Sequence, residues 1–432
     1  MADSAYQAEL EAICPDGWTV VPLTDAAFFQ EGPGILAKDF QENGVPLIRL
    51  KGVEGDFVTL EGCNFLAPEK VADKWSHFRL ERGDLVISTS ASFGRVSEVT
   101  DEAEGAISYT GLIRFRPKTK EIDAGFLRAF LGSAVFMRQV EAMASGSVIR
   151  HFGPMHLKQM ALPLPPNDEQ RAIGEMATLI AERLRNLRQT NATLEAIAAA
   201  LFKFWFVDFD GMSQEDMQES ELGLIPKGWR MEEIGKLVQC VGGATPSTKD
   251  ETFWQGGTHH WATPKDLSGL QAPVLTTTER LITDAGVARI SSGLLPAGTL
   301  LMSSRAPIGY LAIAAVPVAI NQGFIAMPPG GALSPVWLLF WAKANMEAIK
   351  QKANGSTFME ISKAAFRPIK VVAPSQDVLA RFDEVVAPML ERIKNNEHHI
   401  STLSALRDAL LPRLISGRLR IAETTEYLRS QA

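Results

Sequence analysis

The hydrophobic pattern is most regular between residues 168 and 205. Read from Ile173 in alternating steps of four and three, the positions are Ala177, Ile180, Leu184, Leu187, Asn191, Leu194, Ala198, Leu201 and Trp205. This 3.5-residue spacing is typical of a coiled coil, and no Pro or Gly follows Gly174 within the stretch. At 1.5 Å per residue the predicted helix is roughly 55–60 Å long. We therefore expect its apolar edge to pack against another long helix.

The same pattern returns 209 residues later in the chain. The corresponding positions are Phe382, Val386, Met389, Ile393, Asn396, Ile400, Leu403, Arg407, Leu410 and Leu414. Pro412 is expected to end this second helix. An Asn buried in such a seam fixes the register of the two helices at a cost in stability, whereas an Asn at the edge of the seam is simply solvated. The sequence leaves both interpretations open for Asn191 and Asn396.

The duplication extends over nearly the whole chain. GDLVIS at 83–88 returns as GTLLMS at 298–303, and SGS at 145–147 returns as NGS at 354–356. A period near 210 residues indicates a duplicated module rather than a solenoid. In each copy, short β-type runs separated by Gly and Pro precede the long helix. Each copy is thus predicted to be a strand-rich globule followed by one helix.

Length and composition are those of an ordinary globular protein. The 432 residues suit two or three domains, with 46% hydrophobic and 22% charged residues. The longest apolar run, 311–320, is too short to cross a membrane and contains Pro317, and the first residues do not resemble a signal peptide. The cysteines, Cys14, Cys63 and Cys240, are far apart and odd in number. This pattern favours the reducing cytoplasm and argues against disulfides or a cysteine metal site.

The net charge of −7 argues at first against nucleic acid, but the charge is unevenly distributed. Residues 225–374 hold 14 Lys and Arg against 9 Asp and Glu, whereas residues 1–166 hold 16 against 22. Only the third quarter of the chain is therefore basic.

Motifs for several catalytic chemistries are absent from the sequence. The adenine-methylating loop, Asn or Asp followed by Pro-Pro and an aromatic residue, matches neither Pro165-Pro166 nor Pro328-Pro329. No lysine follows an acidic residue at the two-residue offset common in metal-dependent nucleases, and there is no phosphate loop or HExxH zinc site. The pairs His259-His260 and His398-His399 are adjacent, which is not the spacing of two ligands on one helical face. We expect no catalytic centre and no metal site in this chain.

Four segments resemble the specificity subunit of type I restriction-modification systems. They are LPLPPNDEQ at 162–170, LFKFWFVDFD at 201–210, ELGLIPKGW at 221–229 and LLPRLISGRL at 410–419. They resemble the family's helix entry, the end of its central helix, the entry to its second domain and the end of its distal helix. Ser375-Gln376-Asp377 departs from the family's entry to the second helix.

The resemblance implies an α+β fold in which two strand-rich target recognition domains form a pseudo-two-fold repeat, separated by an antiparallel coiled coil of two long helices. It places the first domain at 1–166, the central helix at 167–210, a linker with the second domain at 211–374, and the distal helix and tail at 375–432. The seam that would set the spacing comprises Ile180, Leu184, Leu187, Asn191, Leu194, Met389, Ile393, Asn396, Ile400 and Leu403. At the end of the first helix, Phe204, Trp205 and Phe206 fit packing against the other helix or a partner subunit better than base stacking.

The resemblance also implies a non-catalytic reader of double-stranded DNA in the cytoplasm, each domain binding one half of a split, asymmetric site. Two methyltransferase subunits would dock on the helices and methylate adenine with S-adenosylmethionine. Two ATP-driven, Mg-dependent restriction subunits can join them, and this chain itself would bind no cofactor and no membrane. The rival hypotheses are a two-module scaffold that binds protein or sugar and has no DNA role, and a self-contained nuclease or methylase of unfamiliar type.

Candidate DNA contacts come from basic, amide or hydroxyl side chains on predicted loops, because Arg pairs with guanine and Lys or Ser bonds phosphate. For each, a solvated surface position is the alternative. Lys51 and Lys265 rank higher because they occupy matching places in the two copies. The candidates are Arg49, Lys51, Arg79, Arg95, Ser147, Arg150 and His151 in the first module, and Lys249, His259, His260, Lys265, Arg305, Ser356 and Lys363 in the second.

Overall fold

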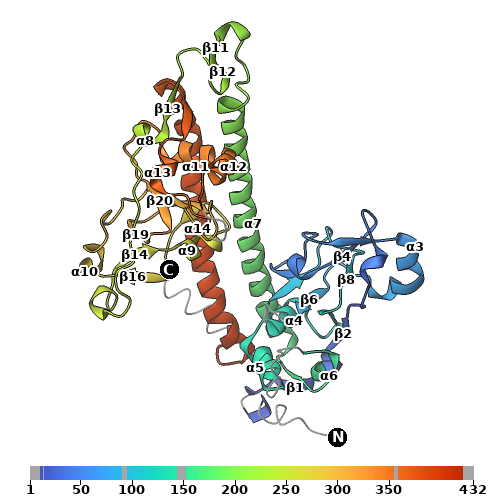
Figure 1. The fold of residues 1–432 in the computed structure, drawn as a ribbon. Helices are drawn as coiled ribbons and strands as arrows, with labels where there is room; N and C mark the ends of the chain where they lie inside the picture. Colours follow the sequence, from blue (N-terminus) through green and yellow to red (C-terminus); the bar gives the residue numbers. More distant parts are fainter. Residues whose placement is uncertain (1–9, 13, 90–94, 144–151, 355–358, 422–432) are drawn as a thin grey trace. The chain divides into compact units, whose positions relative to one another are not determined.

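The computed structural model divides the chain into two compact units, 1–185 with 403–432, and 186–402. It describes residues 10–12, 14–89, 95–143, 152–354 and 359–421. Two long helices belong partly to each unit: α7 (Asn167–Phe206) starts in the first and ends in the second, and α14 (Gln376–Ile415) does the reverse. They are the green and red helices of Figure 1. The two stretches of heptad spacing therefore do form long helices, and the four-segment domain division stays a prediction.

The first unit contains two four-stranded sheets and a two-stranded one. The larger sheet has the order β2-β9-β6-β7 and is antiparallel throughout; the smaller has the order β3-β5-β4-β8, with β4 parallel to β8. The helices α4 (Ala124–Leu131) and α5 (Ala134–Met143) follow the last strand of the larger sheet. The strands are β1 (Thr19–Pro22), β2 (Ala27–Glu31), β3 (Phe40–Gln41), β4 (Val45–Ile48), β5 (Asn64–Leu66), β6 (Leu85–Ser88), β7 (Val96–Glu98), β8 (Ile107–Ser108), β9 (Leu112–Pro117) and β10 (Ala161–Leu164).

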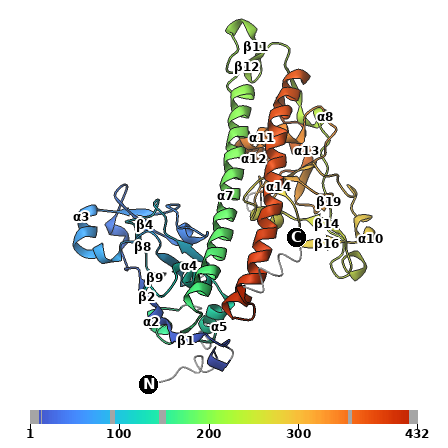
Figure 2. The ribbon, with the colours of Figure 1, turned by 180° about the vertical axis from the view of Figure 1, so that it is seen from behind.

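The second unit repeats this plan. Its small sheet has the order β16-β14-β19, with β14 antiparallel to β16 and parallel to β19, as β4 is to β5 and β8. Its larger sheet centres on β17, which β18 and β20 flank as β7 and β9 flank β6. The elements are β13 (Arg230–Glu233), β14 (His259–Ala262), α9 (Pro264–Ser268), β15 (Val274–Leu275), β16 (Arg280–Ile282), α10 (Asp284–Val287), β17 (Leu300–Ser303), β18 (Leu311–Ala314), β19 (Val318–Ile320), β20 (Phe324–Met327), α11 (Pro335–Ala344), α12 (Met346–Gln351), α13 (Lys363–Phe366) and β21 (Lys370–Ala373). A hairpin, β11 (Met217–Ser220) and β12 (Gly223–Pro226), follows α7 (Figure 2).

The long helices are part of the core of each unit and run antiparallel. In the second unit, Phe202 and Phe206 of α7 pack against Phe382 near the start of α14, with ring centroids 6.0 and 5.1 Å apart. In the first unit, Ile173 near the start of α7 shares one buried cluster with Leu414 near the end of α14. In both units, residues near the start of one long helix thus pack in the same core as residues near the end of the other.

The end of α14 differs from the prediction at Pro412. The helix runs three residues further, to Ile415. Proline removes only its own N–H, and its carbonyl oxygen still accepts a hydrogen bond from Ser416 N (3.2 Å). The chain leaves the helix at Gly417, whose φ of +68° is readily adopted by glycine.

A contact between the strand-rich part of each unit and its long helix is built differently in the two copies. In the first unit the side chain of Asp123 caps α4 by accepting from Phe126 N (2.9 Å), and it lies against Gly174 of α7, where an added Cβ would come 2.3 Å from Asp123 Oδ1. In the second unit the capping residue of α11 is Ser334, and its hydroxyl donates to Asp383 of α14 (2.7 Å). Each copy thus has one carboxylate at this contact: it belongs to the capping residue in the first unit and to the long helix in the second.

Candidate nucleic-acid interface

In the first unit, the three candidate arginines that the structure describes each donate to an oxygen of the unit itself. Arg49, which follows β4, donates to Asn64 Oδ1 (3.0 Å), and its Cζ lies 4.2 Å from the ring centroid of Tyr109. Arg79 donates to Gly105 O (2.8 Å) and Arg95 to Glu54 O (2.7 Å). These carbonyl contacts fix the arginine side chains without neutralising their charge.

The matching lysines occupy equivalent places in the structure. Lys51 follows β4 and Lys265 follows β14, the equivalent strand. Both are exposed and both pair with a glutamate shortly before the neighbouring antiparallel strand, at 2.5 Å for Glu61 and 2.8 Å for Glu279. Each glutamate raises the pKa of its lysine through the hydrogen bond and the charge. The shared position is therefore an exposed ion pair, which contributes little to stability.

The histidines of the second unit lie on β14 and differ in their surroundings. Nε2 of His259 lies 2.7 Å from Asp284 Oδ1, while Nδ1 of His260 lies 3.2 Å from Thr278 Oγ1. Burial lowers the pKa of His260, because the neutral ring tolerates loss of water better than the charged one.

The remaining basic candidates of the second unit fall into two kinds. Arg305 lies 3.9 Å from Glu360, a long ion pair. Lys249 and Lys363 are exposed, and no carboxylate among the described residues pairs with either. Four further candidates, Ser147, Arg150, His151 and Ser356, lie outside the described residues.

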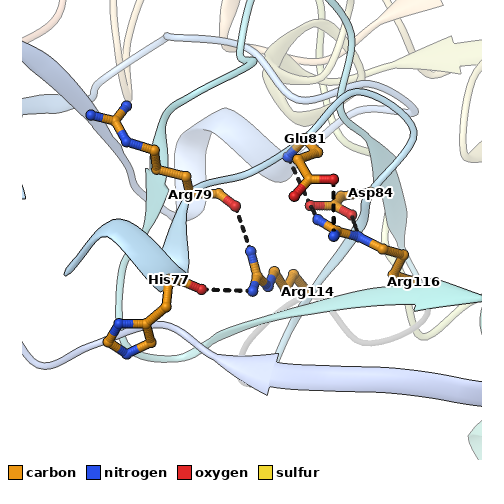
Figure 3. A network of polar contacts seen from close by, with 6 residues as sticks. All are labelled: His77, Arg79, Glu81, Asp84, Arg114 and Arg116. Atoms are coloured by element: carbon orange, nitrogen blue, oxygen red, sulfur yellow. Dashed lines mark hydrogen bonds and ion pairs between the residues drawn. The ribbon is translucent and has the colours of Figure 1, made fainter. Parts of the chain in front are cut away.

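Two arginines of β9 that the sequence did not single out connect the larger sheet of the first unit to residues 77–84, the segment that precedes β6 (Figure 3). Arg116 on β9 donates to both carboxylate oxygens of the buried Asp84 (2.6 and 2.9 Å) and lies 2.9 Å from Glu81. Arg114, two residues earlier on β9, donates to the carbonyl oxygens of Arg79 and His77, the latter at 2.8 Å. Burial lowers the pKa of Arg114. These donors are used inside the unit and are not available to a ligand.

A second arginine group ties a loop of the first unit to α7. Arg128 on α4 is buried and pairs with Glu98 (2.9 Å), and its Cζ lies 5.0 Å from the ring centroid of Phe57. Arg185 on α7 lies over the same ring at 4.1 Å. Phe57 thus contacts two guanidinium groups, one from the module and one from the helix.

Sequence reasoning missed Arg280, which lies on the small sheet of the second unit. Its Cζ is 3.7 Å from the ring centroid of Trp254 and 5.6 Å from that of Trp261. The signal that would have found it is the strand pairing, because Arg280 lies directly opposite Trp261.

All predicted seam positions of the two helices are buried or half-buried. Within the second unit, Asn396 Nδ2 donates to Asn191 Oδ1 (2.7 Å), and Asn191 Nδ2 donates to Glu397 Oε1 (2.7 Å). Both asparagines are at most 2% exposed, so the solvated-edge interpretation is wrong and the buried one holds. Trp205 and Phe206 pack against Phe382 of α14, while Phe204 is exposed.

The described part of the chain contains no group of three or more His, Cys, Asp or Glu side chains placed to hold a metal ion. A search of the same residues for a helix with the length and apolar character needed to span a membrane finds none.

Comparison with known proteins gives one consistent result. Residues 15–197 and 226–402 match the model of the type I restriction modification DNA specificity domain. The specificity subunit of the type I restriction enzyme HindI from Haemophilus influenzae is 24% identical over 404 residues, 79% of this chain and 87% of that one. The MjaIX specificity subunit from Methanocaldococcus jannaschii is 37% identical over 182 residues, and the match spans only 42% of that subunit. The crystal structure of the S subunit of the type I system from M. genitalium covers 92% of this chain and 96% of its own at a TM-score of 0.58 and 15% identity, which shows a shared fold.

Proposed function

Because this chain belongs to the specificity subunits of type I restriction-modification systems, with two target recognition domains, we propose that each domain binds one half of a split, asymmetric DNA site. The helix pair sets the gap between the two halves. The chain itself is not catalytic, and it directs the chemistry of its partner subunits to that site.

The observation that carries this proposal is the duplicated framework with unlike surfaces. The two units share the central strands of both sheets, β5-β4-β8 with β16-β14-β19 and β9-β6-β7 with β20-β17-β18, and they share the ion pairs Lys51–Glu61 and Lys265–Glu279. Next to this framework the side chains differ: Asn64 and Tyr109 lie at the small sheet of the first unit, and Trp254 and Arg280 at that of the second. Two modules of one fold with different polar groups suit two different half-sites.

The chemistry is proposed to come from the partners. Two methyltransferase subunits supply adenine methylation with S-adenosylmethionine, and two restriction subunits that use ATP and Mg²⁺ can join the complex. The chain lacks the sequence motifs of these reactions. An acidic total charge is compatible with DNA binding, because phosphate contacts are local and the partners can add basic surface.

The primary test is methylation by the purified chain, by its methyltransferase subunit and by the complex of the two, followed by sequencing of methylated adenines. We expect methylation only from the complex, at one split site with a fixed gap. Methyl transfer by the purified chain with S-adenosylmethionine would contradict the proposal, and so would a complex that methylates an uninterrupted site.

A second test addresses the spacer. Four residues are inserted after Leu187 in α7 and four before Ile400 in α14, positions that face each other if the Asn191–Asn396 register continues for one more turn. The insertion lengthens the helix pair by about 6 Å, close to two base pairs. We expect a longer gap with unchanged half-sites. Insertion in α7 alone is the control and is expected to disrupt the pair, whereas changed half-site bases would refute the spacer role.

A further inference from the structure

We propose that one arginine in each recognition domain, Arg49 in the first and Arg280 in the second, reads a guanine in the DNA major groove. This inference rests on the proposed function and assigns residues to it. It is carried by the surroundings of these two side chains, which differ from those of the other arginines described above.

Arg280 is held over a fixed aromatic platform. Its Cζ lies 3.7 Å from the ring centroid of Trp254, and the two indoles, Trp254 and Trp261, meet edge to face with centroids 4.9 Å apart. Both indole N–H groups are anchored to one loop: Trp254 donates to Ser247 O (2.9 Å) and Trp261 to Ala244 O (3.3 Å). The rings cannot rotate without breaking these bonds, so the guanidinium rests on a rigid support.

Arg49 has an equivalent support in the first domain. Its Cζ lies 4.2 Å from the ring centroid of Tyr109 and 5.8 Å from that of Phe40. One guanidinium nitrogen donates to Asn64 Oδ1 (3.0 Å). The Asn64 amide thus holds one edge of the Arg49 guanidinium group, and the two aromatic rings hold its flat face.

The two guanidinium groups lie at equivalent positions of the two small sheets, although the arginines occupy different positions in the repeated sequence. In the small sheet of the first domain Asn64 lies opposite Leu47, and in the second Arg280 lies opposite Trp261 of the equivalent strand. Asn64 therefore occupies the position of Arg280, and Arg49 reaches it from the neighbouring strand. Duplication alone does not explain this coincidence, because the two arginines do not correspond in the repeated sequence.

The charge and the free donors indicate the ligand. Among the described residues no carboxylate pairs with Arg49 or Arg280, although both side chains are half-buried. Arg280 keeps all five N–H donors and Arg49 keeps four. By contrast, Arg116 uses its donors on Asp84 and Glu81. A positioned fork with free donors matches the paired O6 and N7 acceptors of guanine.

The test uses the complex with its methyltransferase subunit and DNA carrying the mapped site. In Arg280→Lys and Arg280→Ala we expect one G·C pair of one half-site to lose its preference on the order of ten- to a hundredfold, with the other half-site unchanged. The Arg49 variants should affect only the other half. Alanine should lose the full preference and lysine only part of it, because an ammonium can bond O6 and N7 but lacks the fixed planar fork. Arg289→Ala is the matched control, since Arg289 also lies over a ring, that of Phe253, in the second domain.

A change on the DNA side makes the test independent of folding. Replacing each guanine in turn by 7-deazaguanine removes the N7 acceptor. The wild-type complex should lose affinity at one guanine per half-site, and the alanine variant of the matching arginine should show no additional loss there. If the variants instead weaken binding to all sequences equally and flatten its salt dependence, the arginines contact phosphate and the inference is overturned.

If the wild-type complex methylates a split site but the arginine variants keep its base preferences, this inference alone is overturned. Absence of any split site in the wild type would overturn the proposed function as well.

Discussion

Asn396 Nδ2 donates a 2.7 Å hydrogen bond to Asn191 Oδ1 across the helix pair of the second unit, and both side chains are buried. The bond forms only when these two turns face each other. Because an unpaired buried amide is costly, the pair penalises any shift of one helix along the other. The second hydrogen bond, from Asn191 to Glu397, strengthens this selection of register.

Removal of one asparagine should therefore cost more than removal of both. Asn191→Ala leaves Asn396 and Glu397 without their partner, and we expect a loss of about 1–3 kcal/mol in the free energy of unfolding. The double variant Asn191→Leu, Asn396→Leu should be as stable as the wild type or more so. Urea denaturation followed by circular dichroism measures both, and a double variant weaker than the single one would contradict this account.

The stability of the helix pair should depend on pH through Glu397. Burial raises its pKa above the ordinary value of 4.5, with Asn191 and Arg188 acting in the opposite direction. A carboxyl with a raised pKa in the folded state is unfavourable when ionised, so its penalty is fully present above the folded pKa and disappears below the unfolded one. Glu397→Gln should thus be more stable than the wild type at pH 7. The difference should vanish near pH 4; a constant difference across this range would argue against the titration.

The exchanged contact between module and helix predicts a compensating pair of substitutions. Gly174→Asp forces a second carboxylate against Asp123, and we expect a loss of about 2 kcal/mol or more. Adding Asp123→Ser removes one of the two carboxylates, but the backbone atoms Phe126 N and Gly125 C still lie 2.7 and 2.9 Å from the added Cβ, so we expect it to recover only the electrostatic part of the loss. Thermal unfolding of Gly174→Asp, of Asp123→Ser and of the double variant measures the coupling. Additive effects would show that the two positions do not act together.

The buried ion pair of the first unit should be sensitive to loss of one partner. Arg116→Ala leaves the carboxylate of Asp84, 1% exposed, without its two charged hydrogen bonds. We expect a loss of about 3–5 kcal/mol. The control is Arg82→Ala, which removes the exposed pair Arg82–Asp101 and should change the free energy of unfolding by at most about 1 kcal/mol. Similar losses in the two variants would refute the distinction.

The long helices were predictable because their signal repeats over ten positions. The prediction from 168 to 205 differs by one residue at each end from α7, and the repeat located α14. The repeat did not predict which residues of the two helices contact each other. Translation by 209 residues aligns Asn191 with Ile400, but antiparallel helices bring Asn191 to Asn396.

The candidate interface was less predictable, because a basic residue looks the same in sequence whether its donors are free or used. Arg49, Arg79 and Arg95 each donate one hydrogen bond within their unit, but among the described residues only Arg49 of these three also lies over aromatic rings. Arg280 was passed over because it lies in a strand, and its importance depends on Trp254, 26 positions away in the chain. Strand pairing and ring contacts are long-range facts that composition and spacing do not contain.

The different placement of one carboxylate, on Asp123 in the first copy and Asp383 in the second, limits which domain can be joined to which long helix in a hybrid chain. A crossover between a recognition domain and the helix that follows it can join an Asp123-type cap to an Asp383-type helix, and the hybrid would start with two acids in contact. Crossovers beyond Gly174 or Asp383 carry both members of the pair together. A hybrid that avoids this repulsion would therefore take each domain together with the first turns of its own helix.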